Sequence, residues 1–296
     1  MALFKFKDVS MHGDGFGAIN NLSFVVEQGE TLGILSADSF MHERVLSLLQ
    51  GLYKPDDGQV LFFEKNCRSQ RKELWSTVSF QVFEDAFSPD EKIADFIKLY
   101  QKMHQRHNKE LFSSLVQKLD LNLIGLFRTL GEKNRKKLAL LLALCEESKA
   151  YVLLSPFTCL NNAERSHVIH LLLSFKKNGK TVLILQDSFD YFSLICDRVI
   201  LCMDGEAITE LKDTEMQLAR EKIYHIVFEK ADEADAFAKV WDKKLTINYD
   251  RVTLKLSGSP NVLLNILKDY KVLDFIGGYH DAWIYEEVRA EESIEE

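Results

Sequence analysis

Short apolar runs alternate with helical patterns along the first two thirds of the chain. An apolar run at 31–35 is followed by apolar positions at helical spacing over 45–52. Further apolar runs at 151–154, 181–185 and 199–203 predict buried strands. Because buried strands that alternate with helices form mostly parallel sheets, this part of the chain is predicted to be an α/β domain.

A long stretch in the middle of this region carries helical patterns without strands. Amphipathic patterns cover 93–103 and 111–119, and a strongly apolar helical pattern covers 136–144. We therefore expect a helical subdomain at about 88–145 within an α/β domain that spans 1–219.

The pattern changes after about residue 220. Strand patterns at 224–229, 245–249, 252–256 and near 272–276 are combined with helical patterns at 233–240 and 260–269. This βαββαβ order predicts a small α+β domain of ferredoxin-like type over 220–289. An acidic tail, 290–296, is expected to be disordered.

Charge and composition exclude several classes of protein. The formal net charge of −8 among 296 residues gives no attraction for a phosphate backbone, so no nucleic acid partner is expected. The five cysteines are scattered without CxxC spacing, which predicts neither disulfides nor a metal site. No apolar run approaches the roughly 18–20 residues that span a bilayer, and the N-terminus has the pattern of a strand rather than of a signal peptide. The protein is therefore expected on the cytosolic side.

Six stretches of the chain occur in a characteristic order and spacing. They are INNLSFVVEQGETLGIL (19–35), LSLLQGLYKPDDGQVLFF (46–63), STVSFQ (76–81), KKLALLLAL (136–144), YVLLSPFTCLN (151–161) and TVLILQDSFDYFSLICDRVILCMDG (181–205). Together they resemble the nucleotide-binding subunits of ATP-binding-cassette (ABC) transporters, over residues 1 to about 210. The closest variety is the exporter type with a C-terminal extension. The resemblance implies a P-loop NTPase-like ABC ATPase fold for the first domain.

The same resemblance places the phosphate-binding loop at 36–43, where this sequence departs from the motif. A phosphate loop has the pattern GxxxxGK[ST], in which glycines let the backbone approach the phosphates. Here the glycine positions are Ser36, Ser39 and Met41, the lysine position is His42 and the metal-binding hydroxyl position is Glu43. A side chain in a left-handed glycine position would cost about 1–2 kcal/mol, and Met41 is expected to add bulk where phosphate would lie.

The charge of this loop also argues against ATP. It loses the lysine cation and gains two acids, Asp38 and Glu43. At about 4 Å a carboxylate and one phosphate charge repel by roughly 4 kcal/mol at an effective dielectric of 20. We expect weak or absent binding of ATP and Mg²⁺ and no other cofactor.

The remaining functional positions of the family are altered as well. The signature position contains Leu130, Gly131, Glu132, Lys133 and Asn134; the Walker B aspartate becomes Leu154, the catalytic glutamate Ser155, the D-loop aspartate Asn161 and the switch histidine Asp187. The glutamine of the Q-loop remains, as Gln81. The adenine-stacking aromatic aligns with His12, or with Phe16 as the second choice.

Ordinary structural roles compete with these assignments. A leucine that ends a buried strand is core, Ser155 suits a turn or a helix cap, and a lone Gln81 is more often a satisfied polar residue than a ligand. The basic run Lys133, Arg135, Lys136 and Lys137 is interpreted as a solvated face, with contact to acidic residues of a partner subunit as the alternative.

The sequence therefore suggests a pseudo-ATPase rather than an enzyme. It would be a structural or regulatory subunit of an exporter, on the inner face of the membrane, bound to a membrane subunit and to a second ATPase subunit in a homo- or heterodimer. The membrane subunit would dock around 82–89, where Phe83, Phe87 and Tyr100 are candidate contacts. Two alternatives remain open: an ATPase with an atypical site that uses His42, Glu43 and Asp187, and a soluble scaffold protein with the same fold.

Overall fold

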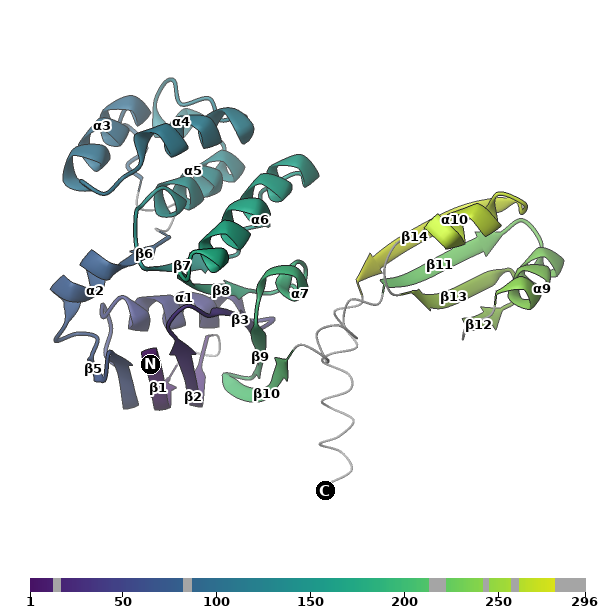
Figure 1. Ribbon diagram of the computed structural model, residues 1–296, viewed down its shortest axis with the longest axis horizontal. Helices are drawn as coiled ribbons and strands as arrows, with labels where there is room; N and C mark the ends of the chain where they lie inside the picture. Colours follow the sequence, from purple (N-terminus) through teal and green to yellow (C-terminus); the bar gives the residue numbers. More distant parts are fainter. Residues whose placement is uncertain (13–16, 82–86, 213–221, 242–244, 257–260, 280–296) are drawn as a thin grey trace. The chain divides into compact units, whose positions relative to one another are not determined.

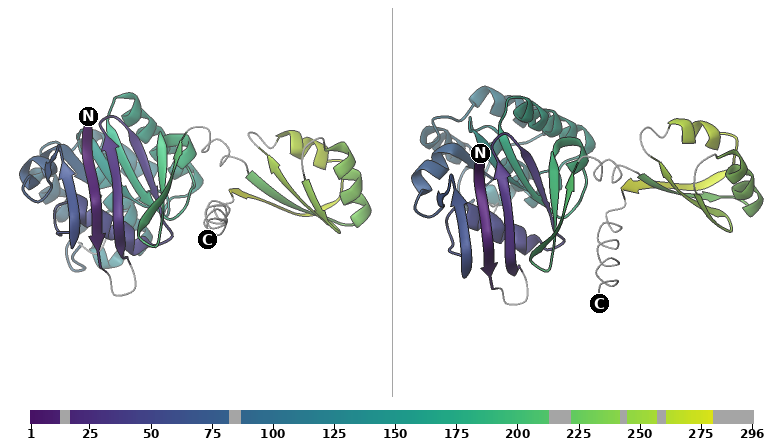
Figure 2. Two further views of the ribbon diagram at one scale, coloured as in Figure 1. Left: turned by 90° about the horizontal axis from the view of Figure 1, so that it is seen from below. Right: turned by 60° about the horizontal axis from the view of Figure 1, so that its bottom comes forward.

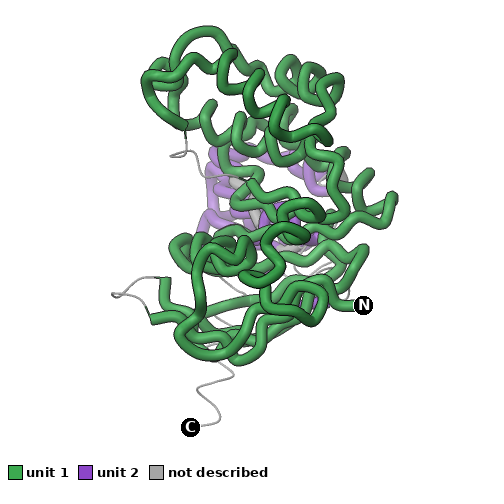
Figure 3. Tube along the Cα trace, turned by 90° about the vertical axis from the view of Figure 1, so that its left-hand side faces the viewer, with its two compact units in different colours: residues 1–188, 194–210 green, residues 189–193, 211–296 purple. Residues whose placement is uncertain are grey.

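The computed structural model describes residues 1–12, 17–81, 87–212, 222–241, 245–256 and 261–279 (Figure 1). The chain divides into two compact units, 1–188 with 194–210, and 189–193 with 211–296 (Figure 3). The predicted tail at 290–296, the domain boundary at 219 and the residues Phe16 and Phe83 lie outside the described residues.

A six-stranded sheet with the order β10-β9-β3-β8-β7-β6 forms the centre of the first unit. Its pairs β6–β7, β7–β8, β8–β3 and β3–β9 are parallel, and every residue of β3 and β8 is buried. The prediction of a parallel α/β core is therefore confirmed. The strands are β3 (Thr31–Leu35), β6 (Val78–Phe80), β7 (Ala150–Leu154), β8 (Thr181–Gln186), β9 (Arg198–Met203) and β10 (Glu206–Lys212).

An antiparallel sheet with the order β2-β1-β4-β5 completes the core of the first unit. Figure 2 shows β1 and β2, in purple, beside β4. Helix α1 (Ser39–Leu49) contributes Met41, Val45, Leu46 and other residues to one apolar cluster that also contains residues of both sheets. Burial of this helix between the two sheets is thus the main link between them. The strands are β1 (Ala2–Met11), β2 (Ile19–Glu27), β4 (Asp57–Phe62) and β5 (Lys65–Asn66).

The helices α3, α4 and α5 gather in one region, at the top of Figure 1. Helix α5 is buried continuously from Lys137 to Leu144, because its sequence is apolar on all sides after its first turn. Among the described residues, no helix has the length and apolar character that a bilayer crossing requires. The helices of this unit are α2 (Arg71–Thr77), α3 (Ile93–Met103), α4 (Lys109–Lys118), α5 (Glu132–Leu144), α6 (Asn162–Lys177), α7 (Phe192–Ile195) and the 3-10 helix η2 (Phe127–Thr129).

The second unit has the predicted βαββαβ order, with an antiparallel sheet arranged as β12-β13-β11-β14. Its core contains Tyr224, Ile226 and Phe228 of one strand together with Phe237 and Leu263 of the two helices. Alternate residues of β11 face this core, as expected for a sheet that is covered on one side. The elements are β11 (Lys222–Phe228), α9 (Ala231–Val240), β12 (Leu245–Asn248), β13 (Arg251–Leu256), α10 (Asn261–Leu267) and β14 (Val272–Tyr279).

Two glycines with positive φ differ in the space around them. Gly58 (φ +77°) lies where a Cβ atom would come within 2.2 Å of the carbonyl oxygen of Asp8, whereas a Cβ at Gly179 (φ +68°) would meet no atom within 4 Å. We expect Gly179→Ala to lower the free energy of unfolding by about 1–2 kcal/mol, from the left-handed torsion alone. Gly58→Ala should lower it by at least about 1 kcal/mol more, because the backbone of β1 must shift. Urea denaturation of both variants measures the difference, and equal losses would contradict the close approach of β1 and β4.

Candidate functional site

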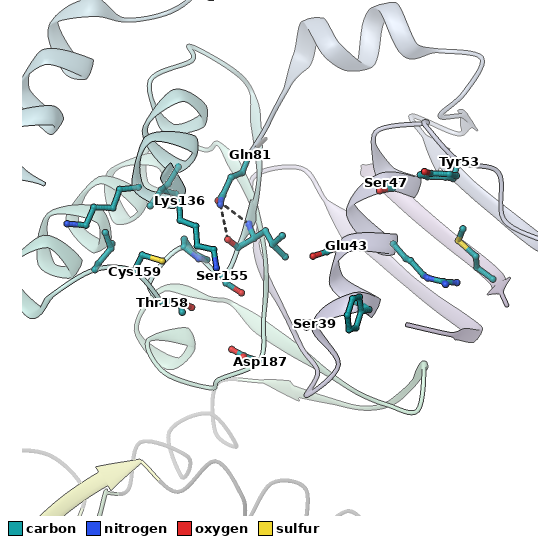
Figure 4. Close-up of a pocket in the computed structure, with 18 residues that line it drawn as sticks. Ser39, Glu43, Ser47, Tyr53, Gln81, Lys136, Ser155, Thr158, Cys159 and Asp187 are labelled. Atoms are coloured by element: carbon teal, nitrogen blue, oxygen red, sulfur yellow. Dashed lines mark hydrogen bonds between the residues drawn. The ribbon is translucent and has the colours of Figure 1, made fainter. Parts of the chain in front are cut away.

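A cavity of about 810 Å³ lies in the first unit (Figure 4). Its lining comes from α1, from the carboxyl ends of β7 and β8, from the loop after β7 and from α5. This edge of a parallel sheet is where ligands bind in α/β proteins. Among the residues predicted from the sequence, it brings together Ser39, Glu43, Gln81, Leu154, Ser155 and Asp187.

The carboxylate of Asp38 caps the first turn of α1. Its Oδ1 accepts hydrogen bonds from the backbone N–H groups of Phe40 (2.9 Å) and Met41 (3.3 Å), and its Oδ2 accepts one from the N–H of Gly17 (2.7 Å). Free N–H groups at a helix N-terminus are what binds a phosphate in phosphate-loop proteins. Here these donors already hold an internal anion.

The loop before α1 is shorter than the sequence suggested. The expected left-handed strain and the expected bulk of Met41 in the phosphate position were both wrong. None of the residues from 36 to 43, all of which the structure describes, has a positive φ. Because α1 begins at Ser39, Ser39 and Met41 take helical torsions that any side chain adopts, and no left-handed strain arises. Met41 is fully buried in the apolar core, so its bulk does not fill the cavity. Ser36 is also buried, and its Oγ accepts a hydrogen bond from the N–H of Asp38.

His42, at the family's lysine position, is a neutral core residue. Its exposed fraction is 0%, and among the described residues neither ring nitrogen has a hydrogen-bond partner. Burial lowers the pKa of His42 to about 4, despite the opposing charges of Asp187 and Asp38. Since His42 is uncharged at neutral pH and does not belong to the lining of the cavity that the structure describes, it supplies no cation for an anionic ligand.

The side chain of Gln81, which lines the cavity, is hydrogen-bonded to the backbone of Leu154. Its Nε2 donates to the carbonyl oxygen of Leu154 (3.0 Å), and its Oε1 accepts from the N–H of the same residue (3.2 Å). Both ends of the side chain are therefore used, as the structural interpretation of a lone glutamine predicted. Leu154 packs against the apolar core.

Ser155, Glu43 and Asp187 are the other predicted residues that line the cavity. Ser155 has φ +43°, and its carbonyl oxygen accepts a hydrogen bond from the N–H of Thr158 (3.3 Å), which identifies it as a turn residue. Glu43 and Asp187 are exposed on opposite walls, on α1 and after β8 (Figure 4). The described lining of the cavity thus includes the carboxylates of Glu43 and Asp187, whereas Leu154 and Ser155 carry none.

Three basic residues of the cavity were not predicted as part of a site. Lys136 forms an exposed ion pair with Glu132 (2.8 Å), and Arg44 donates to the carbonyl oxygen of His12. Lys137 is buried and pairs with Glu164 at 2.5 Å, so its assignment to a solvated face was wrong. The signal was present in the sequence: Lys137 opens an unbroken apolar helical run, which leaves it no polar face.

Other predicted positions lie away from the cavity. Among the described residues, His12 does not line it, and Met11 does. Phe87 is buried and stacks on Phe127 at 4.7 Å, so it is a core residue, while half-buried Tyr100 stacks on His104 at 4.0 Å. Asn161 caps α6 in a capping box with Glu164.

The signature equivalent forms the start of α5. Leu130 is buried, Gly131 is the N-cap, Glu132 and Lys133 are exposed and Asn134 is half-buried. These residues do not contribute to the cavity of their own chain, as the described lining shows. Among the described residues there is also no group of three or more His, Cys, Asp or Glu side chains that could hold a metal ion.

Comparisons with known proteins identify similar chains. No family model matches. The chain is 23% identical over 220 residues to a ribose import ATP-binding protein of Clostridium tetani, a match that covers 70% of this chain and 43% of that protein. It is 24% identical over 216 residues to the Nod factor export ATP-binding protein I of Rhizobium etli, covering 71% and 68%. The chain thus spans less than half the length of the sugar importer that it matches.

Solved structures support the fold. The ATP-binding cassette MJ0796, in a dimeric post-hydrolysis state, superposes with a TM-score of 0.59 at 19% identity, over 71% of this chain and 98% of that one. The protein cbiO1 of Clostridium perfringens, part of an ABC transporter complex, gives a TM-score of 0.53 at 18% identity, over 81% and 94%. The ABC ATPase fold predicted for the first domain is therefore confirmed.

The state of His42 generates a pH prediction. Since its pKa in the folded protein is about 4 and the ordinary value is 6.5, the unfolded chain binds the proton more tightly. Above pH 6.5, neutral His42 makes its full contribution to the free energy of unfolding. As the pH falls from 6.5 toward 4, about 3 kcal/mol of that free energy is lost. Between pH 7 and pH 4, we expect the free energy of unfolding of His42→Leu to fall by about 3 kcal/mol less than that of the wild type. Urea denaturation at each pH measures both. Parallel pH profiles for the two proteins would show that His42 is not buried in neutral form.

The capping role of Asp38 generates a second prediction. Asp38→Ala removes the acceptor of three backbone N–H groups and should lower the free energy of unfolding by about 1–2 kcal/mol. Asp38→Asn keeps one oxygen for the helix amides and should lose less. Urea denaturation at pH 7 measures both variants. Equal decreases in the free energy of unfolding would mean that the hydrogen bonds of the cap do not stabilise the protein.

Proposed function

We propose that this chain, whose relatives and structural neighbours are ATP-binding subunits of ABC transporters, is a cassette subunit that has lost ATP binding and hydrolysis. It serves a transporter of the exporter type as a structural or regulatory subunit. It binds a membrane subunit at the inner face of the membrane and pairs with a second cassette subunit.

The hydrogen bonds of Asp38 carry this proposal. The donors at the start of α1 that would meet a phosphate hold an internal carboxylate instead. A triphosphate would have to displace that carboxylate or lie beside it, at a repulsion of roughly 4 kcal/mol per charge pair at 4 Å. His42 offers no compensating cation, because it is buried and neutral.

The groups that hydrolysis requires are also replaced. A general base positioned near the substrate contributes about 10²–10⁴ in rate, and Leu154 and Ser155 cannot act as one. Gln81 uses both ends of its side-chain amide on the backbone of Leu154, so positioning a water molecule would require breaking two hydrogen bonds. These features support loss of the reaction as well as of the ligand.

The ATPase with an atypical site is supported less well. Glu43 and Asp187 line the same cavity, and either carboxylate has the chemistry of a base or a metal ligand. The third member of that set, His42, is fully buried and does not belong to the described lining of the cavity. The basic residues of the lining have internal partners, since Lys136 pairs with Glu132, Lys137 with Glu164 and Arg44 with the carbonyl oxygen of His12, which favours rejection of a nucleotide over its turnover.

Two observations motivate the finer parts of the proposal. The exporter assignment is motivated by the similarity to the Nod factor export protein, of which the match covers 68%. At the start of α5, Leu130 is buried and the Lys133 side chain is exposed. A second subunit that needs a glycine-rich signature from this chain would meet that lysine, so both composite sites of the pair are expected to be weak.

Equilibrium binding of Mg-ATP tests the proposal. We expect the purified full-length chain to show no saturable binding in isothermal titration calorimetry up to about 1 mM nucleotide, which corresponds to a binding free energy weaker than about 4 kcal/mol. The ATP-binding cassette MJ0796, which has been solved with bound ADP and Pi, serves as the positive control. Binding by the wild type near 1 μM, or about 8 kcal/mol, would overturn the proposal.

A further inference from the structure

The cavity has two walls that belong to different segments of the chain. Lys136, Lys137 and Leu140 of α5 form one part of its lining, and residues 154–160 after β7 form another. The second segment leads directly into α6 at Asn162. The shape of the cavity therefore depends on how α5 is held relative to the start of α6.

A buried ion pair joins these two elements. Lys137 Nζ lies 2.5 Å from Glu164 Oε1, and the two side chains are only 6% and 4% exposed. Lys137 also donates to the carbonyl oxygen of Leu119, the C-cap of α4, at 3.2 Å. One ammonium group thus connects α4, α5 and α6.

The acidic partner is fixed in its turn. Glu164 Oε2 accepts from the N–H of Asn161 (2.8 Å), and Asn161 Oδ1 accepts from the N–H of Glu164 (3.0 Å). Burial raises the pKa of Glu164, but the hydrogen bonds from Lys137 and Asn161 outweigh it and hold the pKa below the ordinary value. The carboxylate is therefore charged at neutral pH, and both of its oxygens have donors.

The opposite end of α5 is fastened to the central sheet. Ser79 Oγ of β6 donates to the carbonyl oxygen of Ala143 (2.8 Å), and Tyr151 Oη of β7 donates to that of Glu146 (2.6 Å). These bonds reach only the last turn of the helix and the residues after it. The Lys137–Glu164 pair is the buried polar connection that the structure describes for the first half of α5.

We propose that the Lys137–Glu164 ion pair is a conformational lock, which sets the separation of the α5 wall and the 154–160 wall without any bound ligand. The inference goes beyond the loss of ATP binding, since it concerns how the cavity keeps its shape. In this buried pair both carboxylate oxygens have donors and the ammonium has two acceptors, and neither charge can leave its partner without remaining unpaired in a low dielectric. An exposed pair such as Lys136–Glu132 has no such constraint.

Hydrogen exchange on the full-length chain tests the lock. In Lys137→Met, which leaves the buried charge of Glu164 unpaired, we expect exchange to become at least about tenfold faster at the end of α4 and the starts of α5 and α6. Exchange in β3 and β8 should stay unchanged. Lys136→Met, on the neighbouring residue of the same helix, is the matched control and should leave all segments as in the wild type.

Two results of the exchange experiment would contradict the proposed conformational lock. A uniform acceleration in all segments, β3 and β8 included, would identify the pair as a general contribution to stability. No acceleration would show that apolar packing alone positions α5. Glu164→Gln removes the charge and leaves one oxygen, which can accept from Lys137 or from the Asn161 N–H but not from both. It should therefore accelerate the same three segments, and it provides the same test if Lys137→Met does not fold.

Discussion

The carboxylate of Asp38 organises the site of this protein. A helix N-terminus leaves backbone N–H groups without partners inside the helix, and a capping side chain can supply the acceptor. In a nucleotide-binding cassette the ligand provides one; here the chain provides its own, with three hydrogen bonds from two segments. The fold can therefore be complete without a ligand. Because α1 packs into the shared core of both sheets, fixing its first turn also fixes one wall of the cavity.

The same principle applies to the other polar groups around the cavity. Gln81 is satisfied by the backbone of Leu154, Lys137 by Glu164 and Leu119, and Arg44 by the carbonyl oxygen of His12. His42 differs, because it is buried with no described partner for its ring and avoids the penalty of a buried charge by staying neutral. Side chains of types that elsewhere contact ligands are thus part of the internal packing of this chain.

The sequence predicted the fold better than it predicted the site. Alternating apolar strands and helices identified the parallel sheet, and the βαββαβ order identified the second unit, because both depend on hydrophobic periodicity. The torsions of Ser39 and Met41 could not be predicted in that way, since they depend on where α1 begins. A motif alignment assumed the loop of the family, whereas the Asp38 cap starts the helix within it. The apolar run after Lys137 indicated its burial, but its ion-pair partner is 27 residues away, and local charge patterns do not reveal such a partner.

The pairing within the second unit has a consequence for how such chains evolve. In its sheet Lys222, at the start of β11, is the partner of Tyr279, at the end of β14. The polypeptide therefore enters and leaves this fold at neighbouring points of adjacent strands. A module with adjoining ends can be acquired, exchanged or deleted by recombination with little disturbance to the host protein. Variation in this module would then be independent of variation in the first unit.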